Sequence, residues 1–130
     1  MKNNLLFPEL SYTLIGICFE THNELGRYAK EKQYGDFLEK KFKELKIPYQ
    51  RELPIADTGN IIDFFIDNKI LIELKAKRIL TRNDYYQIQR YLQICDIKLG
   101  LLVNFRSEYL TPKRVIKIET DNAKKYLSKN

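Results

Sequence analysis

Cysteine is scarce in this chain. Cys18 and Cys95 are the only two, and neither has the CxxC or Cys/His spacing that indicates a zinc site. Each lies in an apolar, helix-like context, which favours two small buried side chains, with a disulfide as the alternative. Sparse cysteine of this kind is typical of a reducing compartment, and we expect a cytoplasmic location.

Long apolar runs are also missing. No window approaches the roughly 18 apolar residues that a membrane span requires. The N-terminus has no basic leader followed by a long apolar run, so we expect no secretory signal and no membrane partner. Repeats, linkers and low-complexity segments are absent. The chain of 130 residues has the length of one domain, and we expect a single domain over 1–130, with a core of about 10–118 and a basic tail over 119–130.

The composition is that of a globular protein with an excess of positive charge. Apolar residues make up 44% of the chain and charged residues 31%, which is ordinary for a soluble domain with a real core. The formal net charge is +6 and the pI is about 9.2. This excess favours an anionic partner, with nucleic acid ahead of a membrane surface.

Apolar spacing and turn signals divide the chain into helices and strands. Pro8 marks a helix start and Gly26 a helix end, and the order α-α-β-β-β-α-β-β indicates a mixed β-sheet flanked by helices. Thr81, Asn83 or Asp84 can cap the third helix. The predicted elements are helices over 8–25 and 29–45, strands over 49–55, 61–66 and 70–75, a helix ending near 95, strands over 99–104 and 115–118, and a helical or frayed tail over 122–130.

The segments 61–66 and 70–75 alternate between apolar and mixed positions. A two-residue turn at 68–69 would pair odd positions with even ones, whereas a three-residue loop over 67–69 pairs Ile66 with Ile70 and Asp63 with Glu73. We predict that loop, or a bulge, because burying each large apolar side chain contributes roughly 1.5–3 kcal/mol. The even-numbered residues predicted to share the core face are Ile62, Phe64, Ile66, Ile70, Ile72 and Leu74.

This register brings Asp63, Glu73 and Lys75 together on the other face. Two carboxylates about 5 Å apart repel unless a cation lies between them, and oxygen clusters of this kind bind hard ions such as Mg²⁺. A lysine one step away can hold a water or neutralise developing phosphate charge. The alternative is a solvated outer face on which these charges have no role, but Phe65 and Leu71 on that face indicate partial cover.

Other polar residues lie at suggestive positions. Glu31 falls on the apolar stripe of the second helix, where a charge is unfavourable unless it is paired or bound to a metal, although acids also favour helix starts. Gln87 and Tyr91 share one face of the third helix, where a surface glutamine and a core tyrosine are the alternative. His22 is predicted to be structural, because a metal–lysine site needs no imidazole. The stripe on the second helix is Tyr34, Leu38, Phe42 and Leu45.

An acid-bearing helix, a strand aspartate, a strand Glu-x-Lys and a helical Gln-x-x-x-Tyr thus follow one another. This succession resembles the PD-(D/E)XK nuclease superfamily and, more closely, the small prokaryotic proteins called GxxExxY that belong to it. Tyr28 stands where the GxxExxY motif has glycine, and the proline that can precede the strand aspartate is absent. The resemblance covers roughly residues 10–118, and its matching stretches are 22–26, 28–34, 62–63, 73–76, 87–92, 100–105 and 113–114.

The resemblance implies a restriction-endonuclease-like fold of the α/β (α+β) class and metal-dependent hydrolysis of nucleic-acid phosphodiester bonds, with DNA favoured. It implies Mg²⁺ or Mn²⁺ held by Asp63, Glu73, the Leu74 carbonyl and Glu31, the last directly or through water. A bound divalent ion lowers the pKa of a coordinated water from about 15.7 toward neutrality. The implied catalytic residues are Glu31, Asp63, Glu73, Lys75, Gln87 and Tyr91, with Lys75 orienting the water and Gln87 and Tyr91 positioning Lys75 or contacting a phosphate.

Basic residues near these motifs are candidates for contacts with a nucleic-acid backbone, which would make binding strongly salt-dependent. For each of them singly, a solvated surface charge is the alternative. Two other classes of function stay open, namely a non-catalytic nucleic-acid-binding module and a protein-interaction subunit, and so does a homo-oligomer. The candidate backbone-binding residues are Arg78, Arg82, Arg90, Lys113 and Arg114.

Overall fold

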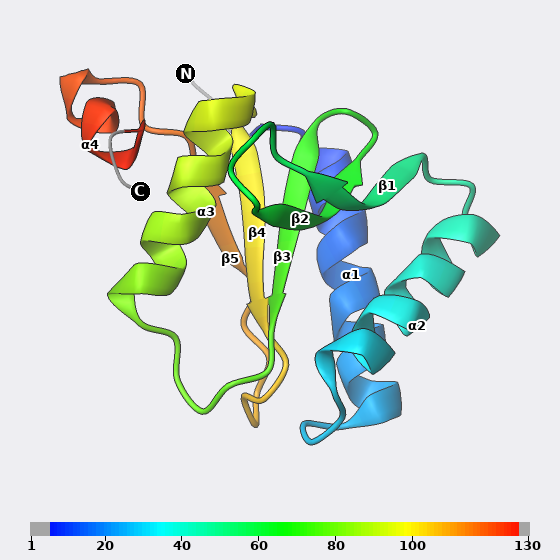
Figure 1. The fold of residues 1–130 in the computed structure, drawn as a ribbon. Helices are drawn as coiled ribbons and strands as arrows, with labels where there is room; N and C mark the ends of the chain where they lie inside the picture. Colours follow the sequence, from blue (N-terminus) through cyan, green and yellow to red (C-terminus); the bar gives the residue numbers. More distant parts are fainter. Residues whose placement is uncertain (1–5, 128–130) are drawn as a thin grey trace.

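The computed structural model describes residues 6–127 and contains a five-stranded sheet with helices on both faces (Figure 1). The strand order is β1-β2-β3-β4-β5, in which β3 and β4 are parallel and the other neighbours antiparallel. Helices α1 and α2 cover one face, and α3 covers the other. The elements are α1 (Pro8–Leu25), α2 (Glu31–Glu44), β1 (Tyr49–Pro54), β2 (Ile61–Ile66), β3 (Ile70–Lys75), α3 (Arg82–Cys95), β4 (Leu99–Asn104), β5 (Lys113–Ile116), η1 (Asp121–Ala123) and α4 (Lys124–Leu127).

The predicted order of elements is confirmed, and the start of α2 is the main difference among the helices. Helix α1 ends where Gly26 takes a φ of 75°, which is favourable for glycine. Helix α2 begins two residues later than predicted, because the preceding segment is held by Tyr34. Its hydroxyl donates to the Gly26 carbonyl at 2.6 Å and accepts from the Ala29 N–H at 3.1 Å.

The end of the chain also differs from the prediction. Strand β5 starts two residues earlier, because it pairs with β4 from Lys113 opposite Leu102 onward. The described part of the tail is helical, which is one of the two predicted alternatives, and residues 128–130 of the predicted tail lie outside the described part. Tyr126 is buried and packs edge-to-face on Tyr86 of α3, with ring centroids 5.2 Å apart. Within residues 6–127, no helix is long and apolar enough to cross a membrane.

The β2–β3 hairpin has the predicted three-residue loop. Ile66 pairs with Ile70, and Asp67 and Asn68 both take positive φ values, 52° and 55°. Lys69 N–H donates to the Ile66 carbonyl at 2.9 Å and closes the turn. Aspartate and asparagine tolerate this left-handed conformation better than most residues, so the turn chemistry and the burial of the apolar set agree.

The prediction that all even-numbered hairpin residues share one face is wrong for Ile62. Phe64 packs against α1 and α2, whereas Ile62 packs with Leu71 and Ile88 under α3. The face changes because β2 pairs with β3 only as far as Phe64 and Ile72 and then leaves it. On the neighbouring strand, Glu52 has a φ of 56°, which breaks the regular alternation at the same level.

Apolar residues fill the space on both sides of the sheet. On α2, the predicted stripe is buried at Tyr34, Leu38 and Phe42, but Leu45 is 52% exposed because it lies just past the end of the helix. Cys18 is buried within the α1 side, and burial raises the pKa of its thiol to about 12. Cys95 is partly exposed, and both cysteines are free thiols.

Helix α3 lies unusually close to β4 at Gly100. A Cβ atom built on Gly100 would come within 2.8 Å of Ile88 Cδ1 and 3.3 Å of Leu71 Cδ1. The missing side chain therefore lets α3 approach the sheet. The distance between α3 and the sheet in turn determines how close the polar side chains of α3 come to β3.

We expect Gly100→Ala to lower the free energy of unfolding by about 1–3 kcal/mol, because the added methyl group overpacks the contact with Ile88. The matched control is Gly16→Ala on α1, where no atom lies within 4 Å of the built Cβ. That change should raise stability by about 0.5–1 kcal/mol through helix propensity. Urea unfolding measures both, and equal effects of the two variants would contradict the close approach.

Candidate active site

Asp63 on β2 and Glu73 on β3 each accept a hydrogen bond from a backbone N–H of the other strand. The Asp63 N–H donates to Glu73 Oε1 at 2.9 Å, and the Leu74 N–H donates to Asp63 Oδ2 at 2.7 Å. Backbone pairing between β2 and β3 ends one position earlier, at Phe64 and Ile72. The carboxylate oxygens therefore accept the N–H groups that backbone carbonyls would accept if the pairing continued, and the two strands separate at this point.

Burial and mutual repulsion make the ionised forms of both acids unfavourable. Glu73 is 5% exposed, and burial followed by the charge of Asp63 raises its pKa to about 8. Burial also raises the pKa of Asp63, and the charge of Glu31 adds to the rise. The backbone hydrogen bonds oppose these shifts without cancelling them. The pair therefore retains a proton near neutral pH and is a place where added positive charge is favourable.

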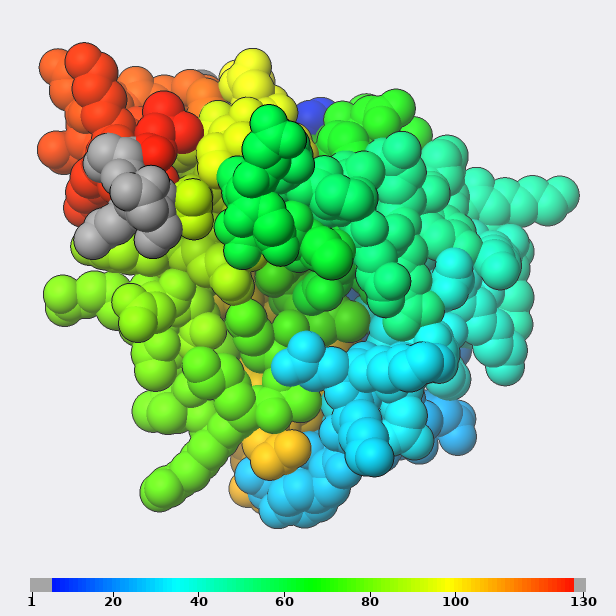
Figure 2. All heavy atoms as spheres, in the orientation of Figure 1, coloured from blue at the N-terminus to red at the C-terminus, as the bar shows by residue number. Residues whose placement is uncertain are grey.

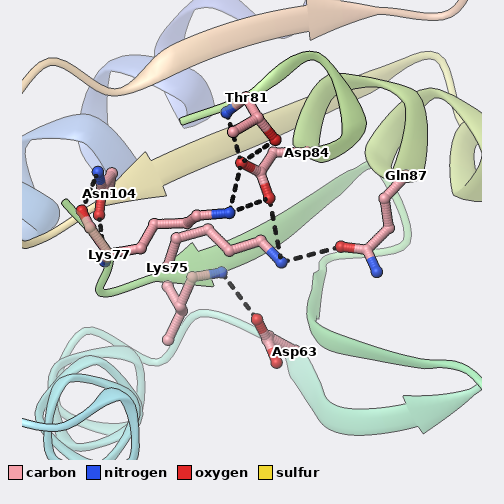
Figure 3. A network of polar contacts seen from close by, with 8 residues as sticks. Asp63, Lys75, Lys77, Thr81, Asp84, Gln87 and Asn104 are labelled. Carbon is pink, nitrogen blue, oxygen red and sulfur yellow. Dashed lines mark hydrogen bonds and ion pairs between the residues drawn. The ribbon is translucent and has the colours of Figure 1, made fainter. Parts of the chain in front are cut away.

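Lys75, the last residue of β3, is held by α3. Its Nζ donates to Gln87 Oε1 at 2.9 Å and lies 3.8 Å from Asp84 Oδ1. Figure 3 shows the lysine extending toward these two side chains, with the Asp63 carboxylate below it. Gln87 thus contacts Lys75, as the resemblance implies, and the helix fixes the position of the ammonium group.

Asp84 is a site residue that sequence reasoning considered only as a helix cap. It is 6% exposed and accepts hydrogen bonds from the Thr81 N–H at 2.7 Å and from Lys77 Nζ at 3.0 Å. Although burial raises its pKa, the bonds from Thr81 and Lys77 bring the pKa below its ordinary value. The sequence signal was Thr-x-x-Asp, a capping box, and the structure shows that the same carboxylate also forms ion pairs with two lysines, Lys75 and Lys77.

The loop after β3 is held by Asn104 at the end of β4. Its side-chain amide accepts from the Lys77 N–H at 3.1 Å and donates to the Lys77 carbonyl at 2.8 Å, as a strand would (Figure 3). Asn104 is buried, so these bonds satisfy polar groups that would otherwise be costly. The sequence pattern did not single out Lys77 or this pairing, because it depends on two segments 27 residues apart.

Glu31 reaches the acid pair from α2. It is exposed at the first position of the helix, so the predicted unfavourable burial on the apolar stripe does not occur. With Asp63 and Leu74 it lines a cavity of about 270 Å³, and its charge raises the pKa of both Asp63 and Glu73. Tyr34, through its bonds to the loop before α2, fixes where Glu31 projects.

Tyr91 is part of α3 and lies on the other side of the pair. It is 3% exposed, and burial followed by the charges of Glu73 and Asp63 raises its pKa to about 12. Tyr91 and Gln87 line a second cavity, of about 300 Å³. Figure 2 shows the surface hollowed between α3, the turn that joins β1 to β2, and the start of α2. The acid pair thus lies between two cavities.

The candidate backbone-binding residues are spread unevenly. Arg78 is exposed in the loop before α3, Arg82 is exposed at the first position of α3, and Arg90 lines the second cavity. Lys113 pairs with Leu102, which in turn pairs with Glu73, so it projects from the site face two strands away. Arg114 points to the opposite face, where its guanidinium donates to the Ser11 hydroxyl of α1, and the structure does not bring it to the site.

His22 contributes to the packing of loops. Its Nε2 lies 2.8 Å from the Ser107 carbonyl, and its ring centroid is 6.4 Å from that of Phe105. These contacts tie the end of α1 to the loop after β4. The predicted structural role fits this position, which is separate from the acid pair.

Within residues 6–127, no group of three or more His, Cys, Asp or Glu side chains is arranged to hold a metal ion. The predicted ligands Asp63, Glu73 and Glu31 are neighbours, but an oxygen of each buried acid is bonded to a backbone N–H instead of facing a common centre. Their chemistry nonetheless fits a hard divalent cation, because raised pKa values and oxygen donors beside a cavity are what such an ion would compensate. The buried side chains would have to turn away from those N–H groups to bind one.

Comparison with protein families agrees with this geometry. Residues 8–117 match the model of the PD-(D/E)XK nuclease superfamily, and the chain belongs to that superfamily. Its members are generally nucleases that use Mg²⁺ or Mn²⁺. Comparison with curated proteins and with solved structures gives no match. The fold is accordingly restriction-endonuclease-like.

We expect the free energy of unfolding in EDTA to fall as pH rises from about 4.5 to about 8. Glu73 has a folded-state pKa of about 8 and an ordinary value of 4.5, so the folded protein holds a proton that the unfolded chain releases in this window. Glu73→Gln keeps a side-chain oxygen for the Asp63 N–H and removes the ionisation. It should raise the melting temperature at pH 8 by several degrees and much less at pH 5.

Thermal unfolding at the two pH values measures this effect, with Glu24→Gln, an exposed acid on α1, as the control. A Glu73→Gln shift that is the same at both pH values would show that Glu73 ionises normally in the folded protein.

Proposed function

We propose that the protein is a divalent-metal-dependent nuclease that hydrolyses phosphodiester bonds, with DNA as the substrate favoured over RNA. The observation that carries the proposal is that Asp63 and Glu73 are hydrogen-bonded across the point where β2 and β3 separate, beside two cavities, with Lys75 close enough for its charge to act on the pKa of both acids. Superfamily membership over residues 8–117 supports the same activity class. The closer assignment to the GxxExxY proteins, a cytoplasmic location and a single domain are part of this proposal.

The acids provide the cation-binding half of the proposed site. Asp63 and Glu73, with Glu31 and the Leu74 carbonyl, would hold Mg²⁺ or Mn²⁺. When bound, such an ion supplies Lewis acidity and lowers the pKa of water toward neutrality. The raised pKa values mean that the acids release a proton when the ion binds, so affinity should increase as pH rises toward 8.

Lys75 provides the complementary positive charge. An ammonium group held at a fixed place can orient a water and offset charge that develops on a phosphate in the transition state. Gln87 and Asp84 hold Lys75 in this role, since both contact its Nζ. Tyr91 packs beside the acids, and its raised pKa keeps the hydroxyl protonated over the working range of pH. Arg78, Arg82, Arg90 and Lys113 contact the substrate backbone in this proposal, with Arg114 assigned to packing.

The experiment is cleavage of labelled single- and double-stranded DNA and RNA with Mg²⁺ or Mn²⁺. We expect Asp63→Ala and Lys75→Ala to lower the cleavage rate by at least about 10²-fold, because each removes a charge at the reacting phosphate. The matched control is Lys69→Ala, which removes an exposed lysine from the turn of the same hairpin and should change the rate less than about twofold. An inert wild type, or variants that cut as fast as it does, would sink the proposal.

A second candidate is a nucleic-acid-binding module without catalysis. It is favoured by the backbone hydrogen bonds that engage both buried acids. This function predicts binding that weakens steeply with salt and is the same in EDTA, in Mg²⁺ and after Glu73→Gln. Affinity measured by fluorescence anisotropy under those conditions separates the two functions. For the nuclease, the metal ion and the Glu73→Gln change should each alter binding or cleavage.

A further inference from the structure

The two cavities beside the acid pair differ in charge. The cavity on the α2 side is lined by three acids, Glu31, Glu52 and Asp63, together with two basic residues. The cavity on the α3 side has no acidic residue in its lining. Its polar groups are three amides and one guanidinium, and its apolar walls are tyrosines. A cation is favoured in the first cavity, and an anionic or neutral polar aromatic ligand in the second.

The aromatic wall of the α3-side cavity is built from two elements. Tyr86 of α3 and Tyr126 of α4 meet edge-to-face at 77°, and Lys125 Nζ lies 5.4 Å from the Tyr86 centroid and 5.2 Å from the Tyr126 centroid. Tyr126 is 7% exposed, so α4 holds this wall against α3. Such a preformed wall can stack a planar ring without ordering a mobile side chain.

The polar side chains that line this cavity include hydrogen-bond donors and acceptors, and one of them, Gln87, contacts Lys75. Gln87 uses its Oε1 to accept from Lys75, so its NH₂ group has to find partners elsewhere. Arg90 Nε is buried and has no hydrogen-bond partner among the described residues, which is unusual for a buried donor. Asn60 from the β1–β2 turn and Asn83 from α3 complete the polar lining. At about 300 Å³ the cavity is at the lower end of the range for ligand sites.

We propose that this cavity binds one unpaired nucleotide of the substrate strand, with its base against Tyr86 and its polar edges toward the amides and Arg90. The proposal rests on the proposed nuclease function, since it names the substrate of the same site. A paired base is stacked inside the duplex and cannot enter such a cavity unless it is extruded. The protein therefore acts on single strands, frayed ends or unpaired nucleotides in preference to intact duplex. The scissile phosphate then lies between this nucleotide and the acid pair.

The test uses fluorescein-labelled single-stranded oligonucleotides, each with one abasic site at a different position. Binding to the full-length chain is followed by anisotropy in Ca²⁺, which takes oxygen ligands. Stacking of one base on an aromatic side chain is worth about 5- to 150-fold in affinity. We expect one abasic position to weaken binding by an amount in this range, and Tyr86→Ala to remove the difference between positions.

Two variants serve as controls. Tyr86→Phe keeps the ring and should behave as wild type. Tyr12→Ala removes a tyrosine that is 82% exposed on α1, on the opposite face of the sheet, and should leave the position dependence unchanged. Thermal unfolding shows whether Tyr86→Ala is folded, and if it is not, the dependence of wild-type binding on the abasic position still decides whether the cavity takes a base.

The outcomes separate this proposal from the proposed function. If wild type cleaves with Mg²⁺ but every abasic position binds equally, the cavity takes no base and the further inference is overturned, while the nuclease stands. If no metal supports cleavage but one abasic position weakens binding in a Tyr86-dependent way, the base site stands and the nuclease fails. Equal binding and cleavage of blunt duplex and single strand would also overturn the inference.

Discussion

The candidate site depends on one exchange of hydrogen bonds. Asp63 and Glu73 accept backbone N–H groups across the end of the β2–β3 ladder, where backbone carbonyls would otherwise serve. This substitution leaves no backbone donor unsatisfied at the point of separation. It also places a buried glutamate beside a half-buried aspartate, and burial raises the pKa of each. The strand opening and the electrostatic strain of the site therefore have a common cause.

At Lys75, the last residue of β3, the arrangement of charges is reversed, because one acid forms ion pairs with two lysines. Asp84 lies near Lys75 and Lys77 and is itself fixed by the first turn of α3. A buried carboxylate with this many donors stays ionised, as its lowered pKa shows. The protein thus raises the pKa of one pair of acids and lowers the pKa of a third acid beside the same strand. Asp63 and Asp84 are both aspartates, yet their pKa values shift in opposite directions, because Asp84 accepts more hydrogen bonds than Asp63 does.

The sequence carried the element order, the hairpin register and the acid pair, because period-two alternation and turn chemistry are local signals. It missed the change of face at Ile62, which arises from the separation of β2 from β3 and not from any local pattern. It also missed the roles of Asn104 and of the Tyr34 hydroxyl, since each depends on a backbone partner that only the fold determines. The sequence indicated Tyr34 only as a core residue and as part of the matching stretch 28–34, and Asp84 only as a possible cap.

The placement of the acid pair between cavities of different charge has a consequence for how a substrate strand can lie. A phosphodiester is anionic, so it is disfavoured beside the carboxyl groups that line the α2-side cavity unless a cation intervenes, and it is attracted toward Lys75. The neighbouring nucleotide then has to extend away from the acids. On the α3 side it meets a lining without carboxylates, whereas on the α2 side it meets more of them. The charge distribution therefore gives the strand a direction across the site before any base is recognised.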